Sequence, residues 1–220
     1  MKGCEFLSVD PQFPDQEMIG KAAQWIKKGG LVVFPTSTFY GLGAHAFNPS
    51  AVQSVFRVKE RRPQKPILVL IACLADLIPL VQSVPMVARR LINAFWPGDV
   101  TLVFHASDVL PPNLTGHTGK IGIRLAAHPV ASALVKAVGS PITGTSANLS
   151  GKGGCMSVTN LDPQIRSQVD LVLDGGELGG GKGSTVVDVT AVPPKILRAG
   201  LISAEKIRAV LSGFANDVFL

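Results

Sequence analysis

The apolar residues of the first thirty positions recur at helical spacing. One face of the segment 15–28 collects four of them: Ile19, Ala22, Ala23 and Ile26. This spacing predicts an amphipathic helix, which Asp15 caps and Gly29 with Gly30 ends. The wholly apolar run 31–34 that follows predicts a short buried strand.

The same alternation continues along the chain. Further helices are predicted over residues 48–59, 85–95, 129–138 and 203–211, and further strands over 67–72, 100–104, 121–125 and 141–143. Strands alternating with helices favour parallel pairs, whereas the later strands 171–173, 185–189 and 195–197 have no helix between them and are expected to pair antiparallel. We therefore predict an α/β fold with one domain over 1–220, built on a single twisted sheet of mixed parallel and antiparallel strands with flanking helices.

The composition supports a folded protein. Of the 220 residues, 46% are hydrophobic and 16% are charged, which excludes a disordered chain. The longest apolar run, 67–75, is far shorter than the ~20 residues that a membrane-spanning helix needs. Glycine and proline number 23 and 16, and this excess indicates many tight turns or loops that approach a ligand closely.

The net charge of +6 has two interpretations. It favours anionic partners such as nucleotides or RNA, or it serves solubility alone, since the chain has no polybasic run. The cysteines at 4, 73 and 155 form no C-x-x-C pair, which argues against a disulfide framework and a zinc site. A reducing compartment, the cytoplasm, is expected.

A segment rich in hydroxyl groups and glycine, 35–43, directly follows the strand predicted at 31–34. Ligands of open α/β sheets bind at strand ends, and Thr36 and Thr38 point the same way if the backbone is extended. The stretch 41–46 imitates a dinucleotide fingerprint, but it lies too far from the strand and lacks an acidic residue ~20 positions on. The segment is a candidate ligand site or an ordinary glycine-rich connection.

Two further polar clusters also lie next to predicted strands. Segment 59–65 holds Lys59, Arg61, Arg62 and Lys65, whose charges repel one another unless they are solvated or neutralised by an anion. It is either a basic helix end or a polyphosphate site. Segment 145–151 carries Ser146 and Asn148, which suit phosphate oxygens or an ordinary turn.

The glycine-rich segment 175–183 begins like a P-loop. Gly183 replaces the required serine or threonine, and a strand follows where a helix is needed, so we predict a flexible loop with Ser184 at its exit. Arg124 and Arg198 end apolar strands, where each must find a partner, solvent or a ligand. Because the sequence offers no catalytic triad, Cys-His pair or carboxylate pair, the chemistry it indicates is positioning and electrostatic stabilisation of phosphates.

Taken together, these segments resemble the threonylcarbamoyl-AMP synthase (YrdC/Sua5/TsaC-like) family. The matching motifs are 35–43, Lys59-x-Arg61, Trp96-Pro97-Gly98-x-x-Thr101, Arg124 with His128-Pro129-Val130, Ser146-Ala147-Asn148-x-Ser150-Gly151, 184–188 and Ile196-Leu197-Arg198-x-Gly200. They occur in register over roughly residues 15–210. The resemblance implies a YrdC-like fold, similar to the RibB fold, with a concave basic cavity, in the short form without the extra C-terminal domain.

The resemblance also implies an activity. Members of the family are nucleotidyltransferases that make threonylcarbamoyl-AMP and pyrophosphate from L-threonine, bicarbonate and ATP. The product supplies the N6-threonylcarbamoyladenosine (t6A) modification at position 37 of tRNA through a separate transferase complex. Mg²⁺ is expected to accompany ATP, with no metal ligand from protein side chains, and tRNA is a candidate partner for the basic surface. The alternative is a non-catalytic RNA-binding factor of the same fold in ribosome or tRNA maturation, or a paralogue with another substrate.

Matching the family motifs position by position implies roles for individual residues. The residues expected at ATP are Lys59, Arg61, Lys65, Ser146, Asn148 and Arg198, of which Lys59 and Arg61 act electrostatically in catalysis. The residues expected at threonine are Thr38, Arg124 and Ser184. No general base is assigned. The chain departs from the family pattern at Ser37, Arg62, Leu70, Lys120 and 154–156.

Overall fold

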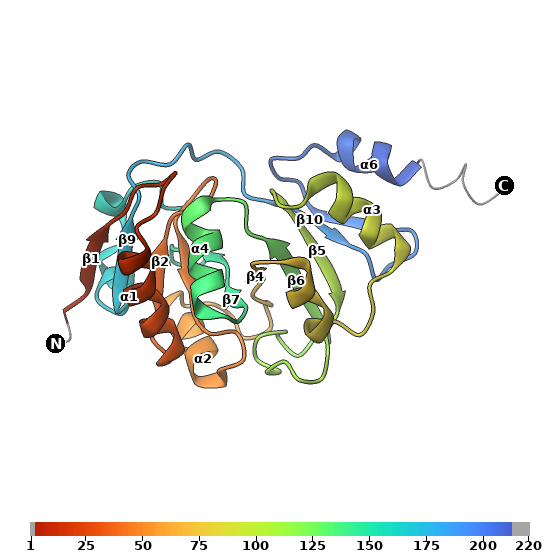
Figure 1. Ribbon diagram of the computed structural model, residues 1–220. Helices are drawn as coiled ribbons and strands as arrows, with labels where there is room; N and C mark the ends of the chain where they lie inside the picture. The colour runs from red at the N-terminus through yellow and green to blue at the C-terminus, as the bar shows by residue number, and fades with distance from the viewer. Residues whose placement is uncertain (1–2, 213–220) are drawn as a thin grey trace.

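A computed structural model, which describes residues 3–212, shows a mixed α/β protein with two sheets (Figure 1). The first sheet has the order β1 (Glu5–Ser8), β9 (Leu171–Asp174), β2 (Val32–Phe34), β3 (Gly41–Gly43) and β8 (Thr145–Ser146). The second has the order β11 (Lys195–Arg198), β10 (Thr185–Asp188), β5 (Val100–His105), β6 (Lys120–Leu125), β4 (Val69–Ile71) and β7 (Ile142–Thr143). Residues 1, 2 and 213–220 of the expected domain lie outside the described residues.

Two of the helices begin at residues whose side chains cap them. Asp15 accepts from two backbone N–H groups at the start of α1 (Gln16–Lys27), and Asn48 does the same for α2 (Pro49–Val58). The other long helices are α3 (Met86–Phe95), α4 (Pro129–Val138) and α6 (Ala204–Ser212). All five predicted helices are confirmed to within one residue at each end. No helix within residues 3–212 has both the length and the apolar character needed to cross a membrane.

Several short elements were not predicted from the sequence. They are the strands β1, β3 and β8, the short helix α5 (Pro163–Arg166), and the 3₁₀ turns Leu74–Leu80 and Val158–Asn160. Each is short or lacks a clear hydrophobic period, so its conformation depends on partners that are distant in sequence.

The pairing expected for the last three strands is only partly correct. β10 pairs antiparallel with β11, as predicted. β9, however, lies in the other sheet, parallel to both β1 and β2, and β10 is parallel to β5. The reason is the glycine-rich segment 175–183, which carries the chain from one sheet to the other instead of turning back as a hairpin (Figure 1).

The single sheet predicted from the sequence is divided in two. β7 belongs to the second sheet and β8 to the first, so the chain changes sheets at the one residue between them, Gly144. A Cβ atom at this position would lie 2.7 Å from side-chain atoms of Leu68 and Leu70. A larger residue at this step between the sheets would require the side chains of Leu68 and Leu70 to move.

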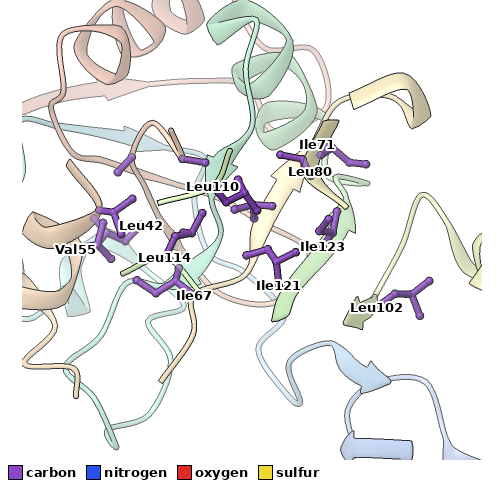
Figure 2. Close-up of a cluster of buried hydrophobic side chains, with 14 of the residues drawn as sticks. Leu42, Val55, Ile67, Ile71, Leu80, Leu102, Leu110, Leu114, Ile121 and Ile123 are labelled. Atoms are coloured by element: carbon purple, nitrogen blue, oxygen red, sulfur yellow. The ribbon is translucent and has the colours of Figure 1, made fainter. Parts of the chain in front are cut away.

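The two sheets share their hydrophobic packing. α1 and α4 lie side by side (Figure 1). α1 packs against β2 and β9 of the first sheet, and α4 packs against β4 of the second, within one cluster of buried apolar residues. The larger cluster contains residues of both sheets and of α2 and α3. Figure 2 shows part of it, with Leu42 of β3, Val55 of α2 and Ile123 of β6. This shared core holds the two sheets together beside the site described next.

Candidate active site

A cavity of about 580 Å³ lies where the two sheets meet. The first sheet contributes Tyr40, Gly41 and Ser146 from β3, β8 and the segment before β3, and the second contributes residues of β5, β6, β10 and β11. Side chains from segments more than a hundred residues apart therefore surround one volume, as expected for a ligand site in an α/β protein.

Alternating residues of two strands line the part of the cavity formed by the second sheet. β6 contributes Lys120, Gly122 and Arg124, and β10 and the residue before it contribute Ser184, Val186 and Asp188. Residues two apart on a strand point to the same face, which explains why both sets reach the cavity. Lys120 Nζ pairs with Asp188 Oδ2 at 2.9 Å.

Three arginines from separate elements line the cavity. The guanidinium of Arg61 donates to the backbone carbonyl oxygens of Lys65 (3.0 Å) and Pro66 (2.7 Å). Burial, and after it the positive charge of Arg198, lowers the pKa of Arg61. Neither Arg61 nor Arg198 forms an ion pair with a carboxylate among residues 3–212. Their charges are therefore available to an anion.

Arg124 is the most deeply buried of the three, with 9% of its surface exposed. Its Nη1 lies 3.1 Å from Asp99 Oδ1, while its Nε is buried with no hydrogen-bond partner within the described part of the chain. Burial lowers the pKa of Arg124, and the Asp99 carboxylate opposes that effect. A buried donor without a partner is uncommon in proteins, and in a cavity it indicates a ligand that accepts.

Arg198 is held by a small network of hydroxyl and carbonyl groups. Its Nε and Nη2 donate to the backbone oxygen of Ser184 at 3.1 and 2.8 Å, and Nη2 is also 3.1 Å from Ser184 Oγ. Ser184 Oγ is in turn 2.8 Å from Thr101 Oγ1. These bonds fix the guanidinium at the wall of the cavity.

Lys59 lies beneath the loop that carries Ser146, and only 2% of its surface is exposed. Its Nζ donates to the backbone carbonyl oxygens of Ser146 and Asn148, the latter at 2.7 Å. Burial, followed by the charge of Arg61, lowers its pKa to about 7. A neutral amine still has two N–H groups, so it can satisfy both carbonyl oxygens without carrying a charge.

The side chain of Asn148 is occupied within its own loop. Its Oδ1 accepts from Ser146 Oγ, and its Nδ2 donates to the backbone oxygens of Leu149 (2.8 Å) and Lys152 (2.7 Å). Asn148 thus determines the conformation of the loop, and Ser146 is the member of the pair that lines the cavity.

The structure brings together most of the site residues expected from the sequence. Those that line the cavity are Thr38, Arg61, Arg124, Ser146, Ser184 and Arg198. Lys59 and Asn148 adjoin it through the Ser146 loop, as described above. The exposed side chain of Lys65 does not line the cavity, and this residue contributes its backbone carbonyl to Arg61.

Sequence reasoning assigned no site role to several lining residues, among them Phe39, Thr101 and Asp188, whereas Thr36 lines the cavity as part of the candidate segment 35–43. Thr101 and Asp188 belong to quoted motifs, and the period of two along their strands was the signal that places them on the cavity face. Of the departures from the family pattern, Lys120 and Gly154 line the cavity. Leu70 is fully buried and Ser37 is exposed, and neither lines it.

The described residues of the cavity do not supply a complete set of metal ligands. Residues 3–212 contain no group of three or more His, Cys, Asp or Glu side chains arranged to hold an ion. The carboxylate of Asp188, which lines the cavity, already pairs with Lys120. Divalent cations need several oxygen ligands, so an ion here would depend on oxygens brought by a ligand.

Comparison with known proteins connects this site to a family. The family model named for Sua5, YciO and YrdC and described as "Telomere recombination" matches residues 24–200. A threonylcarbamoyl-AMP synthase of Pyrococcus abyssi is 38% identical over 190 residues, which are 86% of this chain and 56% of that protein. A putative threonylcarbamoyl-AMP synthase of Mycobacterium tuberculosis is 39% identical over 214 residues, which are 97% of this chain and 98% of that protein.

A solved structure agrees with these matches. The crystal structure of P. abyssi Sua5 complexed with L-threonine has a TM-score of 0.90 and 36% identity, covering 94% of this chain and 60% of that chain. This chain therefore spans little more than half the length of the P. abyssi protein, although it matches nearly the whole mycobacterial relative.

Proposed function

The chain belongs to the family of Sua5, YciO and YrdC proteins, and from this premise we propose that it is a threonylcarbamoyl-AMP synthase. In this proposal it joins L-threonine, bicarbonate and ATP and releases pyrophosphate, and is therefore a nucleotidyltransferase. The product would supply the threonylcarbamoyl group of t6A at position 37 of tRNA, through a separate transferase complex.

One observation carries the proposal: Arg61, Arg124 and Arg198 line one cavity together with Thr38, Ser146 and Ser184. The charges of Arg61 and Arg198 suit a triphosphate, because guanidinium groups bind phosphate oxygens through paired donors. The buried, unpartnered Nε of Arg124 suits an acceptor such as the carboxylate of threonine.

The chemistry consists of two steps. The amine nitrogen of threonine attacks the carbon of bicarbonate, which gives a carbamate and releases water. A carbamate oxygen then attacks the α-phosphorus of ATP, and the bond from that phosphorus to the bridging oxygen of pyrophosphate breaks. Arg61 and Arg198 would stabilise the charge that develops on the phosphates, while Thr38, Ser184 and Arg124 would orient threonine.

Lys59 and Asn148 support the site indirectly in this proposal. They hold the loop of Ser146 and so position Ser146 beside the phosphates. Lys65, whose exposed side chain lies outside the cavity lining, would contact the nucleotide where it extends beyond the cavity. Mg²⁺ would enter as part of the MgATP substrate, held by phosphate oxygens, because the described residues supply no ligand cluster of their own.

The test is to incubate the purified protein with ATP, L-threonine and ¹⁴C-labelled bicarbonate. We expect labelled threonylcarbamoyl-AMP and an equal amount of pyrophosphate, both requiring threonine and bicarbonate together. Pyrophosphate release that does not depend on threonine would overturn the proposal. A protein that binds RNA in a salt-sensitive manner and makes no adenylate would support the alternative RNA-binding role, which rests on the net charge of +6.

A further inference from the structure

The ring of Phe39 lies flat against Gly154 at the wall of the cavity. Both residues line the cavity. A Cβ atom at position 154 would lie 2.5 Å from Cγ and Cδ1 and 2.9 Å from Cδ2 of Phe39. Because these three ring atoms are at similar distances, position 154 faces the flat side of the ring. The absence of a side chain at Gly154 is what lets the ring occupy this place.

Hydrogen bonds hold the segment that contains Phe39 beside the segment that contains Gly154. The backbone N–H of Tyr40 donates to the oxygen of Cys155 at 2.8 Å, and Thr36 Oγ1 donates to the oxygen of Phe39 at 2.6 Å. The N–H of Ala147 donates to the oxygen of Tyr40 at 2.7 Å. The backbone at Phe39 is therefore held between the segment of Gly154 and the loop that follows Ser146.

Phe39 offers an aromatic surface that no other described residue of the cavity supplies. The other aromatic lining residue, Tyr40, is 0% exposed, and its hydroxyl donates to the oxygen of Gly176 at 2.7 Å. A benzene face has no hydrogen bond to offer the carboxylate or hydroxyl group of threonine, and the amine that attacks bicarbonate is uncharged and gains no cation–π contact. A purine base, in contrast, presents a flat π-face to the ring.

We infer that Phe39 binds the adenine base of ATP, with the ring face against the base and Gly154 behind the ring. The inference rests on the proposed function and deepens it. The base then lies beside the wall that carries Ser146, while the triphosphate lies at Arg61 and Arg198. Phe39 is in this sense a specificity-determining residue: it separates nucleotides, which carry a base, from polyphosphates that carry none.

The experiment measures binding to the purified full chain by calorimetry, with ATP, inorganic tripolyphosphate and L-threonine as separate probes. For Phe39→Leu, we expect roughly tenfold weaker ATP binding, which is in the lower range of the effect of base stacking on an aromatic side chain. The affinities for tripolyphosphate and threonine should not change. Ser37→Ala, an exposed neighbour outside the cavity, is the matched control and binds all three probes as the unaltered protein does.

A second variant keeps the test decisive if Phe39→Leu does not fold. Gly154→Ala pushes the ring from its place, so we expect it also to weaken ATP binding and spare tripolyphosphate. In the double variant Phe39→Leu/Gly154→Ala, we expect the loss of ATP affinity to stay close to that of Phe39→Leu alone, because the ring that the new methyl group would displace is no longer present.

The outcomes distinguish this inference from the proposed function. Unchanged ATP binding in Phe39→Leu, equal weakening of ATP and tripolyphosphate, or weakening of threonine alone overturns the inference and leaves the synthase proposal standing. If the unaltered protein binds tripolyphosphate but not ATP, or neither, both fail.

Discussion

The ε-amino group of Lys59 donates to the backbone carbonyl oxygen of Asn148 across 2.7 Å. Together with the bond to the oxygen of Ser146, this contact uses a buried amine to shape a loop at the cavity wall. The end of α2 and the loop that follows β8 are thereby joined, although some ninety positions separate them in the sequence.

Replacing Lys59 by methionine should lower both stability and activity. The change leaves two buried carbonyl oxygens without a donor, which costs about 1–3 kcal/mol of unfolding free energy, and it releases the Ser146 loop. Urea unfolding and pyrophosphate release measure the two effects. Lys152→Met, an exposed lysine of the same loop, is the control, and an equal effect there would contradict a specific role for Lys59.

The stability conferred by Lys59 should increase with pH. The unfolded chain keeps this proton up to the ordinary pKa of 10.5, whereas the folded chain releases it near 7. Between these values the unfolded state binds more protons, so the free energy of unfolding rises with pH, and below about 7 this contribution no longer changes. The measurement is urea unfolding from pH 6 to 10, taken as the difference between the unaltered protein and Lys59→Met. A constant difference above pH 7 would mean that Lys59 stays charged in the fold.

Replacing Arg198 by glutamine should reduce synthase activity on the order of 10²-fold, the usual effect of removing one electrostatic stabiliser. The loss should appear in kcat more than in the KM for threonine, because the charge acts on the phosphates. Lys195→Gln on the same strand, whose side chain is exposed and does not line the cavity, is the control. A variant with normal kcat would remove Arg198 from the proposed mechanism.

Gly200→Ala should destabilise the second sheet. A Cβ atom there would overlap backbone atoms of Gly183, Ser184 and Thr185, and backbone cannot move aside as a flexible side chain does. We expect a loss of about 1–3 kcal/mol or more in urea unfolding. Gly179→Ala, where a Cβ meets nothing within 4 Å, serves as the control and should change stability by less than about 1 kcal/mol.

The sequence predicts the parts of this fold that local chemistry determines. Asp15 and Asn48 mark helix starts because their side chains cap N–H groups a few residues away. The placement of β9 was wrong because pairing depends on which sheet the segment 175–183 leads to, and no local pattern encodes that destination.

The candidate site was likewise predictable from the sequence only in part. The motifs indicated which residues gather, and Thr38, Arg61, Arg124 and Arg198 do line one cavity. The motifs did not indicate how deeply each side chain is buried. From the sequence, the basic segment 59–65 is either a solvated helix end or a polyphosphate site, and neither interpretation indicates that Lys59 is buried beneath the loop of Ser146 and Asn148. The stacking of Phe39 on Gly154 likewise joins two segments that only the tertiary structure brings together.

The cavity wall is formed by two sheets that share one hydrophobic core, so a nucleotide bound there contacts both sheets at once. Its binding free energy adds to the free energy of unfolding of the whole protein. The melting temperature should therefore rise with the logarithm of the concentration of a saturating ligand.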